Sequence, residues 1–368
     1  MSRPRISAAM IVRDEERFLD GCLRSLAGVV DEIVVVDTGS RDASARIAES
    51  HGARVSEFRW CDDFSAARNA ALERATGDWI LYIDADERVV EGDRSTLEPF
   101  LGDPGVAALT VRFRSSAAVS RYREHRLFRN RPEVRFRGVI HETHLPDLWA
   151  FCAREGLRLE HSQLAIDHLG YEGDLERKHR RNLPLLQARL AREPNHVYSW
   201  WHLGATFHGL GDEAAAEDAW RRGVEVVRAK RARTLADSLP HTELARCRLR
   251  RGEDASELLA EGRLWFPDNF TLLWLQGQAW QRAGLHAEAL VIFERLATVD
   301  PEIVAGSLGH DRRIFGEQAC ASAGLCCFRL GRYAEAASWY ARAEQLAEDG
   351  LEYRLKRALA ERRGAVAG

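Results

Sequence analysis

Residues 79–87 read WILYIDADE, a short apolar run that ends in three acids within four positions. The run has the length and the aromatic and β-branched content of a buried β-strand. Asp84, Asp86 and Glu87 follow at its carboxyl end, where like charges repel one another unless something neutralises them. The fold around this strand and the partner of its acids are therefore the first two questions.

The chain around this strand alternates β-rich and helical segments. Strands are expected at 6–12, 31–37, 53–58 and 79–84, and helices at 15–27, 43–51 and 64–75. A βαβ series predicts parallel strands that are buried on both faces and covered by helices. The apolar residues of 15–27 recur at helical spacing on one face, as a helix packed on a sheet requires. We therefore expect an α/β domain with a mostly parallel, Rossmann-like sheet.

Ligands of an open parallel sheet bind where the carboxyl ends of its strands meet. Asp37 ends one predicted strand, the acids of 84–87 end another, and Arg68 lies on the helix between them. A lone Asp-x-Asp is more often a feature of the surface than a site. The acids predict a site only in combination with the segments around them.

Three stretches carry that combination: MIVRDEERFLDGCLRSL (10–26), DEIVVVDTGSRDAS (31–44) and FRWCDDFSAARNAALERATGDWILYIDADE (58–87). In order and spacing they resemble the N-terminal half of the family 2 glycosyltransferases with the GT-A fold, over nearly all of residues 5–88. The most similar branch carries tetratricopeptide repeats behind the catalytic domain and includes peptide glycosyltransferases. One departure is visible, because that branch usually has Lys-Asn-Glu-Glu where this chain has Arg-Asp-Glu-Glu at 13–16.

The resemblance implies a nucleotide-diphosphate sugar, expected to be UDP-linked, as donor and Mn2+ or Mg2+ as cofactor. A dication would neutralise both the acids and the departing diphosphate, and oxygen ligands suit these two metals. By resemblance Asp86 would ligate the metal, and Asp84 would contact the ribose or the metal through water. Asp37 would bind the uracil or ribose, and Arg68 and Ala85 would lie at the nucleotide. A structural salt bridge of Arg68 with an acid of the cluster is the alternative.

The later segments HRLFRN (125–130), FRGVIHETH (136–144) and IDHLGYEG (166–173) resemble further parts of the same branch. An inverting transfer is a single displacement in which a base takes the acceptor proton, and a carboxylate does this well. We therefore predict that Glu142 is the catalytic base. The alternative is that Glu142 only pairs with Arg126 or Arg137.

His168 follows an apolar, β-like run, and a neutral imidazole there could complete the metal shell opposite Asp86. His141 is the alternative third ligand, and Asp84 could also ligate the metal directly. A purely structural histidine is the remaining alternative.

Beyond residue 196 a repeat replaces the β-rich segments. Small and aromatic residues recur at tetratricopeptide spacing in 200–220, 277–301 and 324–340, with a degenerate unit around Ala245 and Gly252. Such all-α solenoids offer a concave surface for a peptide, a protein or another large acceptor, and could also pair two chains as a homodimer. The expected domains are a GT-A domain at 1–172, a linker helix at 173–196 and repeats at 197–368.

Composition excludes several other classes of protein. The 53 Lys and Arg residues nearly balance the 56 Asp and Glu residues, so no basic surface indicates nucleic acid. No apolar stretch approaches the roughly 18 residues of a membrane span, and charges come too early for a signal peptide. The seven cysteines lack a CxxC pair and are expected to be buried thiols. We expect a cytoplasmic protein.

Two functions compete at this point. One is an inverting, metal-dependent glycosyltransferase that acts on an acceptor such as a peptide or protein side chain. The other is a repeat-based interaction scaffold with an inactive transferase domain. An inactive domain would be expected to have lost the Asp-Ala-Asp or the His-Glu pair, and both are intact at 84–86 and 141–142.

Overall fold

The computed structural model describes residues 3–116, 118–170, 175–301 and 308–367. They form two compact units, Met1–Ser116 with Tyr122–Pro194, and Ala117–Arg121 with Asn195–Gly368. The boundary predicted at 172/173 lies outside the described residues, and the three predicted domains stay a prediction.

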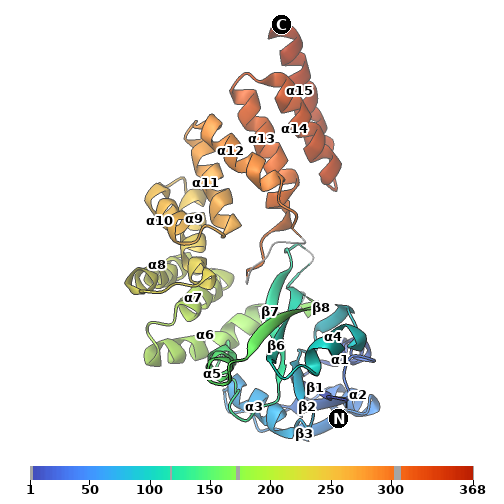
Figure 1. Cartoon of the computed structure of the whole chain (residues 1–368). Helices are drawn as coiled ribbons and strands as arrows, with labels where there is room; N and C mark the ends of the chain where they lie inside the picture. The colour runs from blue at the N-terminus through green and yellow to red at the C-terminus, as the bar shows by residue number, and fades with distance from the viewer. Residues whose placement is uncertain (1–2, 117, 171–174, 302–307, 368) are drawn as a thin grey trace. The chain divides into compact units, whose positions relative to one another are not determined.

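The first unit is built on a mixed sheet, drawn in blue to green in Figure 1. The described strands are β1 Ile6–Val12, β2 Glu32–Asp37, β3 Arg54–Glu57, β4 Trp79–Tyr82, β5 Glu87–Glu91, β6 Val106–Arg114, β7 Tyr122–Arg129 and β8 Arg158–His168. Their order is β3-β2-β1-β4-β7-β6-β8-β5. The strands from β3 to β4 and the pair β6–β8 are parallel, whereas β7 runs antiparallel to β4 and β6, and β5 to β8. Antiparallel strands thus complete the predicted parallel half.

Helices cover both faces of this sheet. They are α1 Glu16–Ser25, α2 Ser44–Ser50, α3 Phe64–Arg74, α4 Arg94–Leu101, α5 Leu145–Glu155 and α6 Leu175–Arg192. Successive residues of a strand point to opposite faces. Ile6, Ala8 and Met10 of β1 therefore pack in one core with α1, α2 and α4, whereas Ala9 packs in the other with α3 and α5. Because helices cover both faces of the sheet, nearly every residue of the central strands is buried, which explains why these strands are almost entirely hydrophobic.

The predicted elements agree closely with this unit where the pattern is strong. β1 has the predicted bounds, and α3 ends one residue before the predicted end. β4 ends at Tyr82, two residues early, because the chain turns there and the Glu87 N–H bonds the Asp84 carbonyl at 3.0 Å. Asp84 and Asp86 therefore lie in the turn between β4 and β5, and Glu87 begins β5.

The second unit is helical in its described residues, apart from the segment 118–121. Its helices are α7 Val197–Gly209, α8 Glu213–Ala229, α9 Leu239–Arg250, α10 Ser256–Trp265, α11 Phe270–Arg282, α12 His286–Ala297, α13 Glu317–Arg329, α14 Tyr333–Leu346 and α15 Leu351–Ala367, with 3-10 turns at Leu235–Ser238 and Arg312–Phe315. The Val119 backbone bridges to Asp311, and the Ser120 N–H bonds the His310 carbonyl at 2.7 Å. The segment between β6 and β7 thus belongs to this unit.

Each of the three clear predicted repeats is a helical hairpin whose glycine faces an aromatic ring. A Cβ added to Gly277 would lie 2.8 Å from Phe293, and one added to Gly324 would lie 2.9 Å from Tyr340. Gly204 meets Trp220 in the same way. The glycines therefore allow the two helices of each repeat to approach closely, as the tetratricopeptide pattern predicts.

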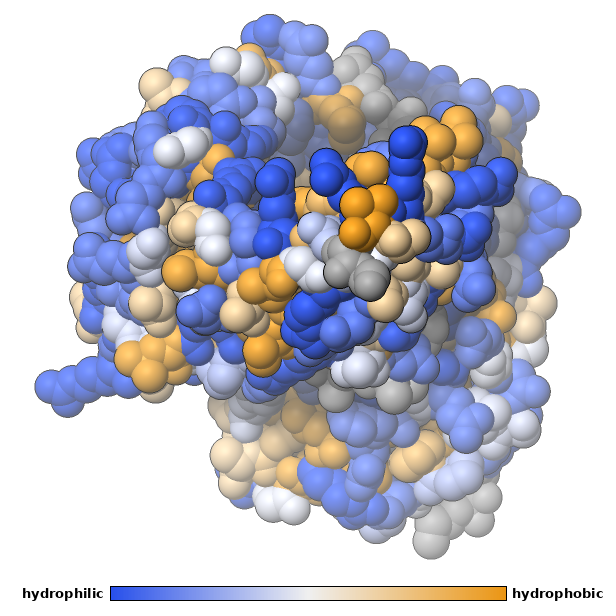
Figure 2. Space-filling model, turned by 90° about the horizontal axis from the view of Figure 1, so that it is seen from above, coloured by the Kyte–Doolittle hydropathy of each residue, from blue (hydrophilic) through white to orange (hydrophobic). Residues whose placement is uncertain are grey.

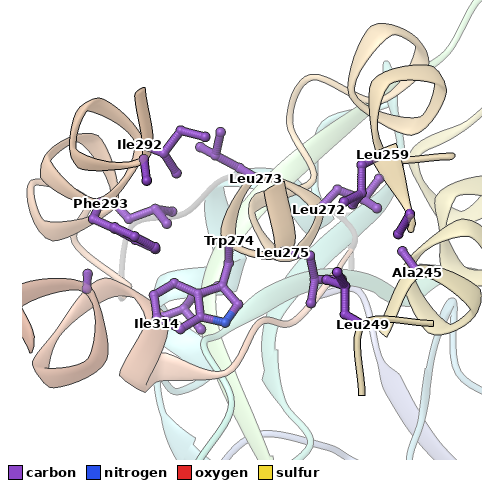
Figure 3. Packing of buried hydrophobic residues seen from close by; sticks show 14 of the residues in the cluster. Ala245, Leu249, Leu259, Leu272, Leu273, Trp274, Leu275, Ile292, Phe293 and Ile314 are labelled. Carbon is purple, nitrogen blue, oxygen red and sulfur yellow. The ribbon is translucent and has the colours of Figure 1, made fainter. Parts of the chain in front are cut away.

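Neighbouring repeats share one core. Figure 3 shows Leu272 and Leu275 of α11 turned toward α9 and α10, and Leu273 and Trp274 turned toward α12 and the 3-10 turn at Ile314. The rings of Trp274 and Phe293 are 5.2 Å apart in an edge contact. Because α11 is buried on both sides, the helices form a continuous stack of repeats.

One face of the molecule is mostly polar. Figure 2 shows one face, on which hydrophilic residues predominate and hydrophobic residues are scattered among them. Every helix within the described residues is too short or too polar to cross a bilayer.

Candidate functional site

Arg68 connects two of the predicted site residues. Its guanidinium donates to Asp84 Oδ1 at 2.9 Å and to Oδ2 at 3.2 Å, and it also donates to Glu142 Oε1. The Arg68 and Glu142 side chains are only 12% and 10% exposed. α3, the β4–β5 turn and the loop before α5 thus meet at one buried guanidinium. The salt bridge expected as the alternative for Arg68 is present, and Glu142 pairs with Arg68 rather than with Arg126 or Arg137.

The positive charges near this contact lower the pKa of Asp84. Burial alone would raise the pKa of Asp84, but the guanidinium groups of Arg68 and Arg126 outweigh burial and lower it. Asp84 is therefore held as a carboxylate.

Asp86 contacts His168 of β8. The His168 Nε2 lies 2.9 Å from Asp86 Oδ2, and its Nδ1 lies 3.3 Å from the Ser115 carbonyl. Burial would lower the pKa of His168, but the hydrogen bond and the charge of Asp86 outweigh burial and raise it. Of the two histidines considered for the metal, His168 is the one that the structure brings to Asp86.

Gly170 makes room for this pair. A Cβ added at Gly170 would collide with the Asp86 carboxylate, and the Leu169 N–H bonds the Asp86 carbonyl at 2.8 Å. The chain after β8 therefore fixes both the backbone and the side chain of Asp86. This explains the glycine in the IDHLGYEG segment, of which Tyr171, Glu172 and Gly173 lie outside the described residues.

Glu87 is turned inward and serves the fold. Its side chain is 2% exposed and forms a two-point pair with Arg126 of β7 at 3.0 and 3.1 Å. It also accepts from the Asp84 N–H at 2.9 Å. The Arg126 guanidinium lies 4.4 Å from the centroid of the Tyr82 ring. Each of the three acids thus has its own basic partner, from α3, β8 and β7, and these partners counter the repulsion within the turn.

The donor set at Asp86 and His168 is compatible with a dication. Adjacent ligands of an octahedral Mg2+ or Mn2+ lie about 3 Å apart, which is close to the 2.9 Å between Oδ2 and Nε2. Within the described residues no group of three or more His, Cys, Asp or Glu side chains is arranged to hold a metal. The choice between His168 and its alternative His141 as the third ligand stays a prediction, and the structure shows the contact with Asp86 for His168.

Asp37 and Ala85 have defined structural contacts. Asp37 is buried at the end of β2, and its Oδ1 accepts from the N–H groups of Gly39 and Ser40 at 2.8 and 2.7 Å. This carboxylate therefore shapes the loop between β2 and α2. The Ala85 side chain is buried in the core with α1, and its carbonyl accepts from Arg88 at 3.0 Å.

Asp14 explains the departure from the family pattern. Its backbone has φ 57°, in the left-handed region where Asp and Asn are several-fold enriched. Its Oδ1 accepts from the Arg41 N–H at 2.7 Å, and its own N–H donates to Ser40 at 3.1 Å. Asp can therefore replace Asn here, because either side chain can take up this conformation and accept this bond.

Glu15 lies within the electrostatic reach of Asp84 and Asp86 and was not among the residues predicted from the sequence. Burial, followed by repulsion from Asp86 and Asp84, raises the pKa of Glu15 to about 7. Glu15 therefore belongs electrostatically to the same acidic edge of the sheet. Its position in the matched Arg-Asp-Glu-Glu segment was the available signal.

Comparison with protein families finds a match in the part of the chain that carries most of these residues. Residues 7–155 match the family model described as Glycosyl transferase family 2. A TPR repeat-containing protein of Synechococcus elongatus is 38% identical over 232 residues, which cover 60% of this chain and 57% of that protein. The glycosyltransferase SunS of Bacillus subtilis is 28% identical over 243 residues, covering 60% of this chain and 53% of SunS. The chain thus spans little more than half the length of either relative.

Solved structures include more distant matches. The glucosyl-3-phosphoglycerate synthase of Mycobacterium tuberculosis, in complex with Mn2+, UDP-glucose and phosphoglyceric acid, is 18% identical with a TM-score of 0.37. That match covers 51% of this chain and 79% of the other. The mannosyl-3-phosphoglycerate synthase of Rubrobacter xylanophilus is 19% identical, with a TM-score of 0.38 over 52% of this chain and 75% of the other. From the family model, residues 7–155 of this chain are a glycosyltransferase family 2 domain, which lies in the α/β unit, and the all-α region behind it is consistent with tetratricopeptide repeats.

Proposed function

We propose that the protein is an inverting, metal-dependent glycosyltransferase that moves a sugar from a UDP-linked donor to a large acceptor, such as a peptide or protein side chain. The observation that carries this proposal is the contact of Arg68 with both Asp84 and Glu142. It joins the acids at the end of β4 to a carboxylate 58 positions further along the chain, in a domain of the matching family. The guanidinium of Arg68 thus binds both Asp84, the acid proposed to contact the donor, and Glu142, the proposed base.

Asp86 and His168 are the proposed metal ligands. Their donor atoms have the separation of adjacent ligands, and Gly170 leaves space at the carboxylate. When bound, Mn2+ or Mg2+ would neutralise the charge that develops on the departing diphosphate. Asp84 is proposed to contact the ribose or the metal through water, and Asp37 the uracil or the ribose. Because Asp37 Oδ1 already accepts from Gly39 and Ser40, Oδ2 is the oxygen proposed for this contact.

Glu142 is the proposed base. Arg68 holds its Oε1 and so orients the carboxylate, while Oε2 is the proposed proton acceptor. The acceptor nucleophile would give its proton to Glu142 and attack the anomeric carbon from the side opposite the diphosphate. One such displacement inverts the anomeric centre.

The repeats are proposed to bind the acceptor or to pair two chains. The proposal draws on the repeat geometry and on the names of the two relatives, one a repeat-containing protein and one a glycosyltransferase. The second candidate function, a scaffold with an inactive transferase domain, is favoured by one observation. Asp84, Asp86 and Glu87 each have a basic partner within the protein, so a metal is not required to neutralise them.

Replacing Asp86 separates these two functions. UDP with manganese should raise the melting temperature of the wild type, since a ligand at about 100 times its Kd stabilises by about 2.7 kcal/mol. Asp86→Ala should abolish the manganese-dependent part, and Asp218→Ala, at an exposed acid of α8, should keep it. A manganese-dependent shift of equal size in Asp86→Ala would refute the metal assignment. No shift in the wild type with a panel of nucleoside diphosphates would favour the scaffold.

A further inference from the structure

The loop that carries Glu142 has an unusual backbone. Its ends are closed by two hydrogen bonds between Arg137 and Thr143, at 2.9 and 3.0 Å. Between them Gly138 has φ 104° and His141 has φ 50°. Few residues other than glycine adopt this left-handed conformation, although His does so more often than most, so the contacts around the loop help to hold His141 there.

Three successive carbonyls of this loop are held from outside. The Phe64 N–H at the start of α3 donates to the Val139 carbonyl at 3.0 Å. Arg189 of α6 donates to the Ile140 carbonyl and, at 3.3 Å, to the carbonyl of His141. The strained residue directly before Glu142 is therefore bonded to an arginine 48 positions further along the chain.

Arg189 is built into this contact. Its side chain is 6% exposed. A Cβ added to Gly138 would lie 2.7 to 2.9 Å from its guanidinium, so the glycine leaves space for it. The guanidinium thus lies against Gly138 and donates to the Ile140 and His141 carbonyls.

We infer that Arg189 is a positioning residue for the base. By fixing the Ile140 and His141 carbonyls it keeps the loop in the one conformation that directs Glu142 to Arg68. α6, which the sequence suggests is only a linker, is on this inference a working part of the transferase site. The inference rests on the proposed role of Glu142.

Local exchange provides the first test, independent of activity. In Arg189→Gln, the amides of Phe64, Arg137 and Thr143, which the loop bonds protect, should exchange roughly tenfold faster, because a buried charged hydrogen bond is lost. Arg192→Gln, at the exposed end of the same helix, should leave them unchanged. Unchanged exchange at all three amides in folded Arg189→Gln would overturn the inference.

Kinetics provide the second test, with UDP-glucose, manganese and water as the acceptor and release of UDP as the readout. Arg189→Gln should lower kcat roughly 10- to 100-fold with little change in KM, because a base displaced by about 1 Å costs on this order. Arg189→Lys should recover part of the rate, since an amine can still reach one carbonyl. A raised KM with an unchanged kcat would contradict a positioning role.

A double-mutant cycle separates this inference from the function on which it rests. If Arg189 acts through Glu142, Arg189→Gln should change the rate of Glu142→Gln by less than about twofold. Multiplication of the two losses would overturn the inference alone. A fully active Glu142→Gln would instead overturn the proposed base. If the wild type releases no UDP from UDP-glucose, the exchange measurement decides.

Discussion

The acidic edge of the sheet and the stack of repeats are specified by different kinds of contact. At the edge, buried charges meet opposite charges from distant elements, as in Glu87 with Arg126 and Arg68 with Glu142. In the repeats, a glycine meets an aromatic ring at a fixed distance along the chain, as in Gly277 with Phe293. The charge pairs position chemical groups, and the glycine–ring contacts allow close packing of helices. Variants in each region test whether the site and the packing of the repeats can be changed independently.

Breaking the buried pair should have the largest effect. Glu87→Gln removes the two-point partner of the buried Arg126 and leaves Glu124 as its remaining carboxylate partner, so it should destabilise the first unit by about 3 kcal/mol. Urea unfolding measures this loss. Glu352→Gln is the matched control, because it breaks the exposed pair with Lys356 and should cost less than about 1 kcal/mol. Similar losses of unfolding free energy in the two variants would show that burial does not determine how much an ion pair stabilises this protein.

Removing the base should impair the chemistry more than the fold, because Arg68 keeps its pair with Asp84. Glu142→Gln keeps the shape of the side chain and should lower the rate of transfer on the order of 100-fold, or about 2.7 kcal/mol, with donor affinity preserved. A thiol acceptor should suffer less, because a thiolate forms readily without a base. The rate of UDP release and calorimetric binding of UDP measure the two quantities. Loss of UDP binding would assign Glu142 to donor binding instead.

Acid should act on the first unit through His144. Burial among the rings of Tyr82, Phe128 and Phe136 lowers the pKa of His144 to about 3. The unfolded chain binds this proton near pH 6.5 and the folded chain does not, so stability falls as the pH drops from about 6.5 toward 3. Between pH 7 and 5 the loss should be about 2 kcal/mol from this residue. His144→Phe should flatten the dependence, and an unchanged slope would exclude His144 as its cause.

The smallest effect is expected in the repeats. Gly204→Ala forces a Cβ against Trp220 and should destabilise the second unit by about 1–2 kcal/mol. Gly364→Ala of α15, whose Cβ would meet Tyr333 at an ordinary 3.4 Å, should be neutral or stabilising. Melting curves with and without UDP measure both variants. A reduced affinity for UDP in Gly204→Ala would show that the packing of the repeats affects the donor site.

Local pattern was enough to predict much of the fold. The apolar, β-rich run of 6–12 gave β1 its observed bounds, and the spacing of Gly204, Gly277 and Gly324 identified three hairpins before their packing was visible. Both depend on residues close in sequence. The end of β4 was predicted two residues late, because the turn at Asp84 is set by a hydrogen bond with Glu87 that apolar content does not reveal.

The pairing within the site could not be predicted in the same way. Arg68 was expected near the nucleotide or an acid, but its contact with Glu142 spans 74 positions and depends on a loop with its own strained backbone. Glu87 was grouped with Asp84 and Asp86 at the end of the strand, and it is instead buried with Arg126. Arg189 had no signal at all, since an arginine on a charged helix is usually solvated. Whether these residues bind a donor or act in transfer stays a prediction.

The contact of α6 with the Glu142 loop also bears on how such proteins exchange their parts during evolution. A crossover at residue 172, where the sequence suggests that the catalytic domain ends, would keep the strands, the acids and Glu142 but would separate them from Arg189. A crossover after Pro194 would transfer α6 together with the domain it supports. On this view the unit that is inherited together is the sheet with α6, and different repeats could follow it while Arg189 keeps its contact with the Glu142 loop.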